Sequence, residues 1–364
     1  METIARMLAV SVFVLLSACT QPPARNSPVG LSFAVYEDSE RRSWTGPENR
    51  PLRTVVWYPA AAGAKESEWR VSILRAGWSA QDAPFVASPK KFPLVVLSHG
   101  TGAAAAQVSW LAETLASNGY VVAAVNHHGN TIAEDEYVPH GFMLWWERAR
   151  DVSVLIDNLL SDPRFGPRID SSRIGLGGHS LGGYTALAIA GARLDREQWQ
   201  RFCAANSHNP ACELPPEAPV SMAEVRRLLE QDEVIKASVK RASESYRDKR
   251  VRAVYAIAPA LGPAMTRSSL NRITIPVRIT VGTMDVNAPP ETNAKAIAGS
   301  VPNAQLQLLP DVTHYMFVAP CNLWGRIVAR WLCSDPQGLD RRELHRLVGA
   351  DALEFFNRTL SPGT

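Results

Sequence analysis

A G-x-S-x-G run at residues 178–182, with Ser180 at its centre, restricts the folding of this chain more than any other stretch. It follows a short apolar segment at 173–177 and precedes a run of small, helix-compatible residues at 184–190. Between a strand and a helix this pattern is typical of a nucleophile elbow, a turn so tight that only small residues fit two positions either side of the serine. An ordinary glycine-rich turn is the alternative. We predict that Ser180 is a catalytic nucleophile.

The elbow would serve Ser180 in two ways. It holds the hydroxyl clear of the sheet, and it places the N–H of Leu181 at a helix N-terminus, where developing negative charge is stabilised. Gly178 and Gly182 are the small residues that the turn needs, and Gly183 would let the helix pack close to the sheet.

Apolar runs alternate with helical patterns along most of the chain, which predicts an α/β fold with a doubly wound, mostly parallel sheet. Residues 30–36 and 53–58 read as an antiparallel start, and we assign the core to 30–192 and 251–364. Continuous apolar runs indicate strands buried on both faces. The further strands are expected at 92–98, 120–125, 173–177, 253–257, 276–281 and 304–309, and helices at 104–118, 147–160 and 316–331.

Residues 193–250 interrupt this alternation. The segment is polar, with helical patterns at 222–229 and 234–246. Inserted after the elbow helix, it would lie over the edge of the sheet where open α/β sheets bind ligands. We predict a helical cap over a substrate pocket, and a surface excursion away from the site is the alternative.

A serine hydroxyl needs a base to take its proton and an acid to orient that base, and on this scaffold they follow in the order Ser, Asp/Glu, His. His314 follows the last predicted strand and is our base. His345 lies among arginines in a terminal helix and reads as a solvated surface residue, and His208 falls in the cap.

Asp285 is the predicted acid, since it comes just after the strand at 276–281. It would fix the tautomer of His314 and stabilise its imidazolium form. Two other carboxylates compete. We expect Glu291 to open the next helix, and Asp311 stands so near His314 in sequence that the loop would have to fold back sharply.

An oxyanion hole needs a second backbone N–H besides that of Leu181. The loop after the first buried strand, 98–102, should supply it from Thr101, with Gly102 as second choice. His99 in this loop is expected to orient the loop rather than to act as a base. We expect it and Gly100 beside the substrate.

Two further features suggest pocket residues. His127 and His128 leave the strand that precedes the elbow strand, and we expect one of them, His127, to line the pocket. A metal site is disfavoured because adjacent histidines point to opposite sides of an extended chain and no third ligand is suitably spaced. Trp145, next to Trp146, could line an apolar acyl pocket or serve in core packing.

The first residues have the pattern of a signal peptide for export. Arg6 precedes an apolar segment at 8–16, too short to span a bilayer, and small residues follow it. Leu16-Ser17-Ala18-Cys19 resembles a bacterial lipobox, which implies removal of residues 1–18 and lipidation of Cys19; an ordinary signal peptide is the alternative. Because Thr20 stands where an aspartate would signal retention, we expect anchoring to the outer membrane on its periplasmic side. Residues 19–29, rich in proline, would form a tether.

The remaining cysteines are four, which in an exported chain suggests disulfides. Proximity in sequence favours Cys203–Cys212 and Cys321–Cys333. Zinc is the competing interpretation, but no C-x-x-C spacing supports it. The formal net charge is only +3, without basic runs interleaved with aromatics, so nucleic acid is not an expected partner.

The stretch from Phe92 to His314 resembles exported serine hydrolases of the dienelactone hydrolase-like, platelet-activating-factor acetylhydrolase-like branch of the α/β-hydrolase superfamily. The resemblance rests on segments 97–100, 120–127 and 162–182 together with Asp285 and His314. It implies hydrolysis of carboxylic esters without a cofactor, including esters of short or oxidised acyl chains on phospholipid. True dienelactone hydrolases use a cysteine where this chain has Ser180, so lactone chemistry does not carry over.

Three other functions compete with a serine esterase of short-to-medium acyl esters. They are a phospholipase A acting on the membrane, a non-catalytic lipoprotein that binds an envelope partner, and a peptidase. The sequence does not fix the oligomeric state.

Overall fold

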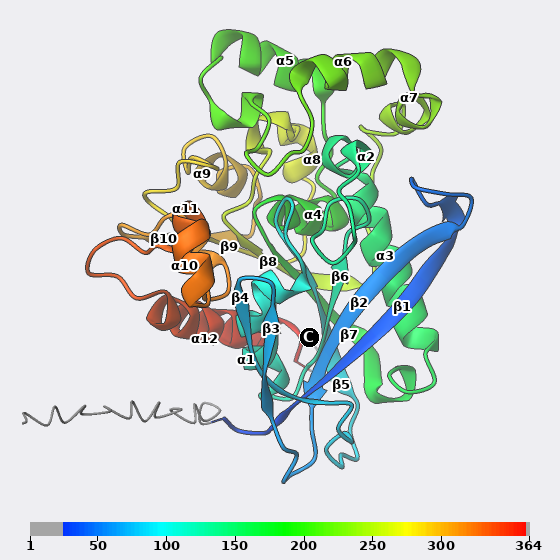
Figure 1. Cartoon of the computed structure of the whole chain (residues 1–364), viewed down its shortest axis with the longest axis vertical. Coiled ribbons are helices and arrows are strands. Elements are labelled where there is room, and N and C mark those ends of the chain that lie inside the picture. Colours follow the sequence, from blue (N-terminus) through cyan, green and yellow to red (C-terminus); the bar gives the residue numbers. More distant parts are fainter. Residues whose placement is uncertain (1–24, 362–364) are drawn as a thin grey trace, which may run out of the picture.

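The computed structural model describes residues 25–361, and it is built around one sheet of ten strands with helices against it (Figure 1). The strand order is β10-β9-β8-β7-β5-β6-β2-β1-β4-β3. From β10 to β6 all neighbours are parallel, while β2 is antiparallel to both β6 and β1. The predicted doubly wound, mostly parallel α/β fold is therefore confirmed. The strands are β1 (Val29–Arg42), β2 (Asn49–Pro59), β3 (Ser67–Val71), β4 (Leu74–Gln81), β5 (Phe92–Ser98), β6 (Val121–Asn126), β7 (Ile169–His179), β8 (Val251–Ile257), β9 (Val277–Gly282) and β10 (Ala304–Leu309).

The central strands are apolar along their whole length because both of their faces are covered. Every residue of β5 and of β6 is buried. Among the helices that cover the sheet, α1 packs against α12, and α3 packs against α4. The helices are α1 (Ser109–Ala116), α2 (Pro139–Met143), α3 (Glu147–Ser161), α4 (Leu181–Ala190), α5 (Arg196–Ala205), α6 (Met222–Gln231), α7 (Glu233–Val239), α8 (Arg267–Leu270), α9 (Ala294–Ala298), α10 (Leu323–Val328), α11 (Arg330–Cys333) and α12 (Arg341–Thr359).

The order of the strands reverses at β5, although the strands on both sides of it remain parallel. β5 lies between β6 and β7, so the chain moves to one side of β5 and then returns to the other. Loops leaving two such strands at their carboxyl ends separate and leave a crevice, which is where open α/β sheets bind ligands. The loop after β5 and the turn after β7 meet there.

The segment 193–250 forms the three cap helices α5, α6 and α7, drawn above the sheet in Figure 1. The predicted Cys203–Cys212 disulfide is present and ties the end of α5 to the following turn. Glu147, the first residue of α3, holds the far end of the cap: its carboxylate accepts hydrogen bonds from Ser238 and Arg241. The Trp146 indole also donates to Ser238 Oγ at 2.9 Å.

The chain departs from prediction where two further elements meet. The hairpin of β3 and β4 was not anticipated, and the expected continuous helix at 316–331 is instead a 3₁₀ turn (His314–Phe317) followed by α10 and α11. The backbone between the 3₁₀ turn and α10 pairs with the hairpin. The N–H of Arg75 donates to the carbonyl of Pro320, and Leu74 forms an isolated antiparallel β-bridge with Cys321. This pairing removes 320–322 from a helix. The predicted Cys321–Cys333 disulfide closes the same segment.

The predicted tether is held in place over its last residues. Arg25 donates to Glu66 at 3.2 Å and to the carbonyl of Trp78 at 2.9 Å, and it forms an ion pair with Glu113. The chain is thus fixed from Arg25 onward rather than from residue 30. The predicted signal peptide (1–18) and lipidation site (Cys19) lie outside the described residues. Within residues 25–361, no helix is both long enough and apolar enough to cross a bilayer.

The expectation that His345 is a solvated surface residue was wrong. Its ring is buried on the inner face of α12, stacked on Trp110 at 4.2 Å, and its Nε2 donates to the carbonyl of Met316 at 2.9 Å. Burial lowers the pKa of His345 to about 3, so the imidazole stays neutral. The helical pattern alone did not show which side α12 turns toward α1.

This buried histidine should make the protein sensitive to acid. The unfolded chain takes up a proton on His345 near pH 6.5, whereas the folded protein does not until about pH 3. The free energy of unfolding should therefore fall as pH is lowered through this window. We expect His345→Gln, which keeps a donor, to make that decline shallower by about 1.4 kcal/mol per pH unit. Denaturant unfolding at several pH values measures it. His208→Gln, at an exposed cap position, should leave the slope unchanged; equal slopes for all three proteins would contradict the expectation.

Candidate active site

The turn between β7 and α4 has the strained geometry of an elbow. Ser180 has φ 58° and ψ −119°, a backbone conformation that side-chain-bearing residues rarely adopt. Its N–H donates to the carbonyl of Ile257 at 2.9 Å, which fixes the turn against β8. A Cβ on Gly182 would lie 1.9 Å from the Ser98 carbonyl oxygen, and one on Gly178 would lie 2.3 Å from that of Gly182. Both glycines are required by close approach of backbone, as predicted.

The predicted base and acid lie together at the same edge of the sheet. His314 Nδ1 is 2.7 Å from Asp285 Oδ2, and both side chains are buried. The other carboxylate oxygen, Oδ1, accepts the N–H groups of Asn287 at 3.0 Å and Ala288 at 2.8 Å. With Asp285 accepting at Nδ1, the second ring nitrogen of His314 is left to face a substrate or a nucleophile. Ser180 and His314 line one cavity.

The rival residues lie elsewhere. Glu291 is exposed and pairs with Lys295 at 2.7 Å. Asp311 is exposed in the loop after β10, with φ 60°. His208 is exposed on the cap. Within residues 25–361, no ion pair joins Glu291 or Asp311 to His314, and none joins His208 to a carboxylate.

A second histidine, His179, backs the first. Its ring lies 4.6 Å from that of His314, and its Nε2 donates to the His314 carbonyl at 3.1 Å. Burial, with His314 nearby, lowers the pKa of His179 well below the usual value, so it stays neutral. His179, the residue between Gly178 and Ser180 in the G-x-S-x-G run, therefore supports the backbone of the predicted base.

Between Gly100 and Gly102 in the loop after β5, the described structure leaves the N–H of Thr101 without a hydrogen bond. The N–H of Gly100 donates to Gln107 Oε1 and that of Gly102 donates to Asn130 Oδ1, each at 2.6 Å. Among the hydrogen bonds of residues 25–361, none uses the N–H of Thr101, and Leu181 is the first residue of α4, whose N–H has no partner within the helix. Thr101 and Leu181 both line the cavity with Ser180. Because the N–H of Gly102 is engaged, it is not available as the alternative donor.

A buried ionic network lies beneath this loop. Arg148 donates to the carbonyl of His99 at 2.7 Å and to Asn130 Oδ1 at 2.8 Å. Because Asn130 Oδ1 also accepts the N–H of Gly102, Arg148 links both ends of the loop. Three residues further along α3, Asp151 accepts hydrogen bonds from Arg50 at 2.7 Å and from His127 at 2.9 Å. Burial alone would raise the pKa of Asp151, but Arg50 and Arg41 hold it well below its usual value.

Sequence reasoning missed this network. Its only signal was a pair of opposite charges three residues apart on an otherwise apolar helix face, Arg148 and Asp151 beside Val152 and Leu155. On a solvated helix that spacing would describe an ordinary surface ion pair.

The pocket roles expected for two histidines were wrong. His99 and His127 are fully buried behind the loop, and neither is among the residues lining the cavity. His127 Nε2 bonds Ser98 Oγ at 2.8 Å, and its backbone N–H donates to His99 Nε2 at 3.1 Å. Burial lowers the pKa of His127 to about 3. Both rings belong to the network that supports the loop.

His127 and its neighbour His128 reach different partners. His128 Nδ1 lies 2.8 Å from Glu134 and its Nε2 accepts the N–H of Trp44 at 3.0 Å. In the part of the chain that the structure describes, no three His, Cys, Asp or Glu side chains are grouped so as to hold a metal ion.

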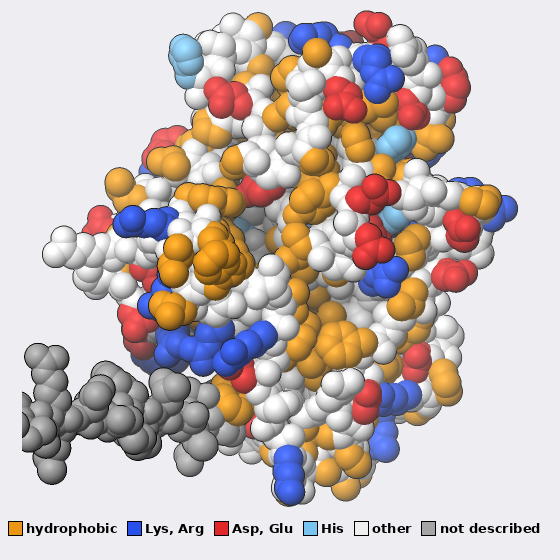
Figure 2. All heavy atoms as spheres, viewed as in Figure 1, with side chains coloured by type: hydrophobic (Ala, Val, Ile, Leu, Met, Phe, Trp, Pro, Cys, Tyr) orange, Lys and Arg blue, Asp and Glu red, His pale blue; other side chains and the backbone are white. Residues whose placement is uncertain are grey.

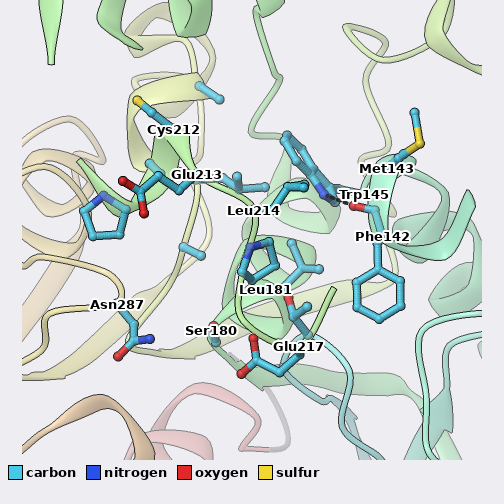
Figure 3. A pocket seen from close by; sticks show the side chains of 18 of the residues that line it. Phe142, Met143, Trp145, Ser180, Leu181, Cys212, Glu213, Leu214, Glu217 and Asn287 are labelled. Atoms are coloured by element: carbon cyan, nitrogen blue, oxygen red, sulfur yellow. Dashed lines mark hydrogen bonds between the residues drawn. The ribbon is translucent and has the colours of Figure 1, made fainter. Parts of the chain in front are cut away.

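The cavity above Ser180 measures about 410 Å³ and lies between core and cap. Gly100 and Trp145 line it, as expected. In Figure 3, Phe142, Met143 and Trp145 form one wall, and Cys212, Glu213 and Leu214 of the cap lie above Ser180. The Trp145 ring meets Trp199 of α5 edge-on, with 5.5 Å between centroids. The wall is therefore apolar and is shared by both parts of the chain.

The cap also contacts the edge of the sheet that carries His314, through the hydroxyl of Tyr315. Tyr315, which follows His314, donates to Glu217 Oε1 at 3.0 Å and accepts from Asn287 at 3.1 Å. A Cβ on Gly102 would lie 2.8 Å from the Glu217 Cβ, so the cap rests directly on the loop after β5.

Comparisons with known proteins agree with this architecture. Residues 72–139 match the family described as platelet-activating factor acetylhydrolase, isoform II, and residues 106–215 match the prolyl oligopeptidase family. Cutinase 2 of Thermobifida cellulosilytica is 33% identical over 103 residues, which are 28% of this chain and 35% of that protein. Bis(hydroxyethyl) terephthalate hydrolase of Streptomyces coelicolor is 31% identical over 110 residues, 30% of this chain and 32% of that protein. The chain thus matches about a third of the length of these relatives.

A solved structure extends the likeness to nearly the whole chain. Ferulic acid esterase from Streptomyces cinnamoneus superposes with a TM-score of 0.59 at 20% identity, covering 93% of this chain and 92% of that one. At this identity the likeness concerns the fold. Together with the elbow at Ser180 and the six parallel strands, it identifies the chain as a protein of the α/β-hydrolase fold.

Proposed function

We propose that this protein is a serine hydrolase that cleaves carboxylic esters of short-to-medium acyl chains through an acyl-enzyme, with Ser180, His314 and Asp285 as its triad. The observation that carries the proposal is the Asp285–His314 pair at 2.7 Å, whose histidine lines one cavity with an elbow serine. The cutinase, terephthalate ester hydrolase and ferulic acid esterase named above support ester bonds as the substrate class.

Each group has one task in the proposed reaction. Ser180 Oγ attacks the ester carbonyl while His314 Nε2 takes its proton, and the carbonyl oxygen becomes an oxyanion held by the N–H groups of Leu181 and Thr101. The intermediate collapses, the C–O bond to the alcohol breaks, and His314 returns the proton to the leaving alcohol. Water, deprotonated by His314, then attacks the acyl-enzyme. The bond between the acyl carbon and Ser180 Oγ breaks, His314 returns the proton to Oγ, and the acid leaves. No cofactor takes part in these steps.

Other functions fit less of the site. A phospholipase A or platelet-activating-factor acetylhydrolase-like activity is the second candidate, supported by the family match at residues 72–139. A peptidase has the match at 106–215 in its favour. A non-catalytic envelope binding protein would have no need for the Asp285–His314 pair. Lipidation at Cys19 and an outer-membrane location on the periplasmic side belong to the proposal, and mass spectrometry of the membrane-extracted N-terminus tests them.

Ser180→Ala should abolish labelling by a fluorophosphonate probe and reduce hydrolysis of p-nitrophenyl butyrate by about 10⁴-fold or more, since the nucleophile is lost. Gel fluorescence and initial rates measure both. Ser207→Ala, at an exposed serine of the cap, should keep labelling. Retained turnover in Ser180→Ala would refute the triad, and an aminoacyl p-nitroanilide hydrolysed faster than the ester would make the protein a peptidase.

Asp285→Asn should lower kcat by about 10³- to 10⁴-fold with little change in KM, because an amide can hold His314 in the wrong tautomer. The matched variant Glu291→Gln, at an exposed carboxylate near the same loop, should stay within about twofold of the wild-type rate. Steady-state kinetics on p-nitrophenyl butyrate measures the two. Equal losses in both variants would mean that Asp285 is not the orienting acid.

The shared wall predicts where chain-length preference is set. Trp199→Ala opens the cap side of the cavity next to Trp145, so we expect the p-nitrophenyl ester of highest kcat/KM to shift toward longer acyl chains. Val234→Ala, at an exposed cap position, should leave the profile unchanged. A wild-type profile that rises steeply toward long, aggregated substrates would favour the phospholipase alternative, and an unshifted profile in Trp199→Ala would remove α5 from the acyl site.

A further inference from the structure

Five large apolar side chains stand exposed on α10 and α11, beside the pocket. Leu323, Trp324, Ile327, Val328 and Trp331 are each between 51% and 76% exposed. Figure 2 shows them as an apolar patch on the face turned to the viewer, over α10 and α11 of Figure 1. Contiguous apolar surface of this kind marks an interaction site more often than a chance exposure. We call these five residues the α10–α11 patch.

The patch cannot turn inward, because the opposite side of the two helices is fixed to the core. Cys321 and Cys333 are buried and joined by a disulfide. Gly325 also faces inward, where an added Cβ would come within 2.9 Å of Ile73. The apolar side chains are therefore held outward by the fold.

The composition of the patch fits a lipid surface. Tryptophan is favoured at membrane interfaces, where its ring contacts acyl chains and its N–H reaches water. Arg326 and Arg330, on the same two helices, are exposed, and the ion pairs formed within residues 25–361 do not include them. Unpaired arginines next to an apolar helix face add attraction to anionic headgroups.

The described chain also begins near the patch. Arg25 bonds the carbonyl of Trp78 in β4, and the same strand starts at Leu74, which bridges Cys321 at the base of α10. Four residues of strand correspond to about 13 Å. The described chain thus begins on the side of the patch. Cys19, whose lipidation belongs to the proposed function, precedes Arg25 by six residues in the sequence, so a lipid on it and the patch would serve the same bilayer.

The structure points to the α10–α11 patch as a docking surface for a phospholipid bilayer that carries anionic headgroups. Docking there would also present the pocket to the lipid. The ring of Trp331 is 4.9 Å from that of Tyr315, which lines the cavity. This second part rests on the proposed function: the esters it predicts as substrates are those exposed at a bilayer surface.

Vesicle sedimentation tests the docking apart from catalysis. The protein used is Ser180→Ala lacking residues 1–20, which retains every residue that the structure describes, so that neither turnover nor the N-terminal apolar segment contributes. We expect binding to phosphatidylcholine vesicles that contain phosphatidylglycerol. The double variant Trp324→Ser with Ile327→Ser should bind them at least about tenfold more weakly. Arg326→Gln with Arg330→Gln should lose about fivefold per arginine on these vesicles and little on pure phosphatidylcholine.

Matched controls separate the patch from general stickiness. Val35→Ser with Val234→Ser removes two exposed apolar side chains far along the chain from α10, and it should bind as the parent does. Equal binding by the Trp324/Ile327 pair and the parent would overturn the proposal. So would a dimer in analytical ultracentrifugation that the Trp324/Ile327 pair dissociates, because the patch would then bind a second copy.

With Ser180 restored, the Trp324/Ile327 pair should hydrolyse soluble p-nitrophenyl butyrate at the wild-type rate and a vesicle-embedded ester about tenfold more slowly. Equal loss on both substrates would contradict a docking role. Vesicle binding by a wild-type protein that hydrolyses no ester would leave the docking surface standing and refute the proposed function, so the two failures are distinguishable.

Discussion

The contact between the elbow and β5 is the constraint on which the site depends. The backbone of Gly182 lies so close to the carbonyls of Ser98 and His99 that no side chain fits between them. This contact sets the distance between the start of α4 and the loop after β5. The two amides that face the cavity, from Leu181 and Thr101, come one from each side of it. A change in that spacing would move one amide relative to the other, so glycine here governs the geometry of both.

The loop after β5 is held by charge as well as by packing. Arg148 and Asp151 carry opposite charges into the core on one helix, and each finds several partners. Buried charges are tolerated when they are paired and hydrogen-bonded. Removal of one partner leaves a buried charge whose desolvation is no longer compensated. The network therefore gives the loop one arrangement, at the expense of making every member hard to replace.

Much of this could be predicted from the sequence, and the parts that could not share a physical cause. The strand at Phe92–Ser98 was bounded correctly, because a strand buried on both faces leaves a continuous apolar run. The strand at Ala304–Leu309 was also bounded correctly, although it lies at the edge of the sheet and is only partly buried. The pairing of Cys203 with Cys212 and of Cys321 with Cys333 followed from proximity in sequence. His99, His127 and His345 were misplaced because sequence gives a residue's chemistry but not which neighbours cover it. The helix expected at 316–331 failed because its competitor, pairing with β4, comes from far away in the chain.

The cap leaves and rejoins the core at almost the same point. The N–H of Asp248 donates to the carbonyl of Ile189 at 3.0 Å, and Arg247 lies against Gly191. An insertion whose ends are adjacent places little demand on the domain that carries it. The pieces of this molecule can therefore diverge at different rates: the segment that shapes the pocket is free to be shortened, lengthened or exchanged, while the sheet that holds Ser180, Asp285 and His314 stays as it is. A lineage could acquire new substrates here without rebuilding its chemistry.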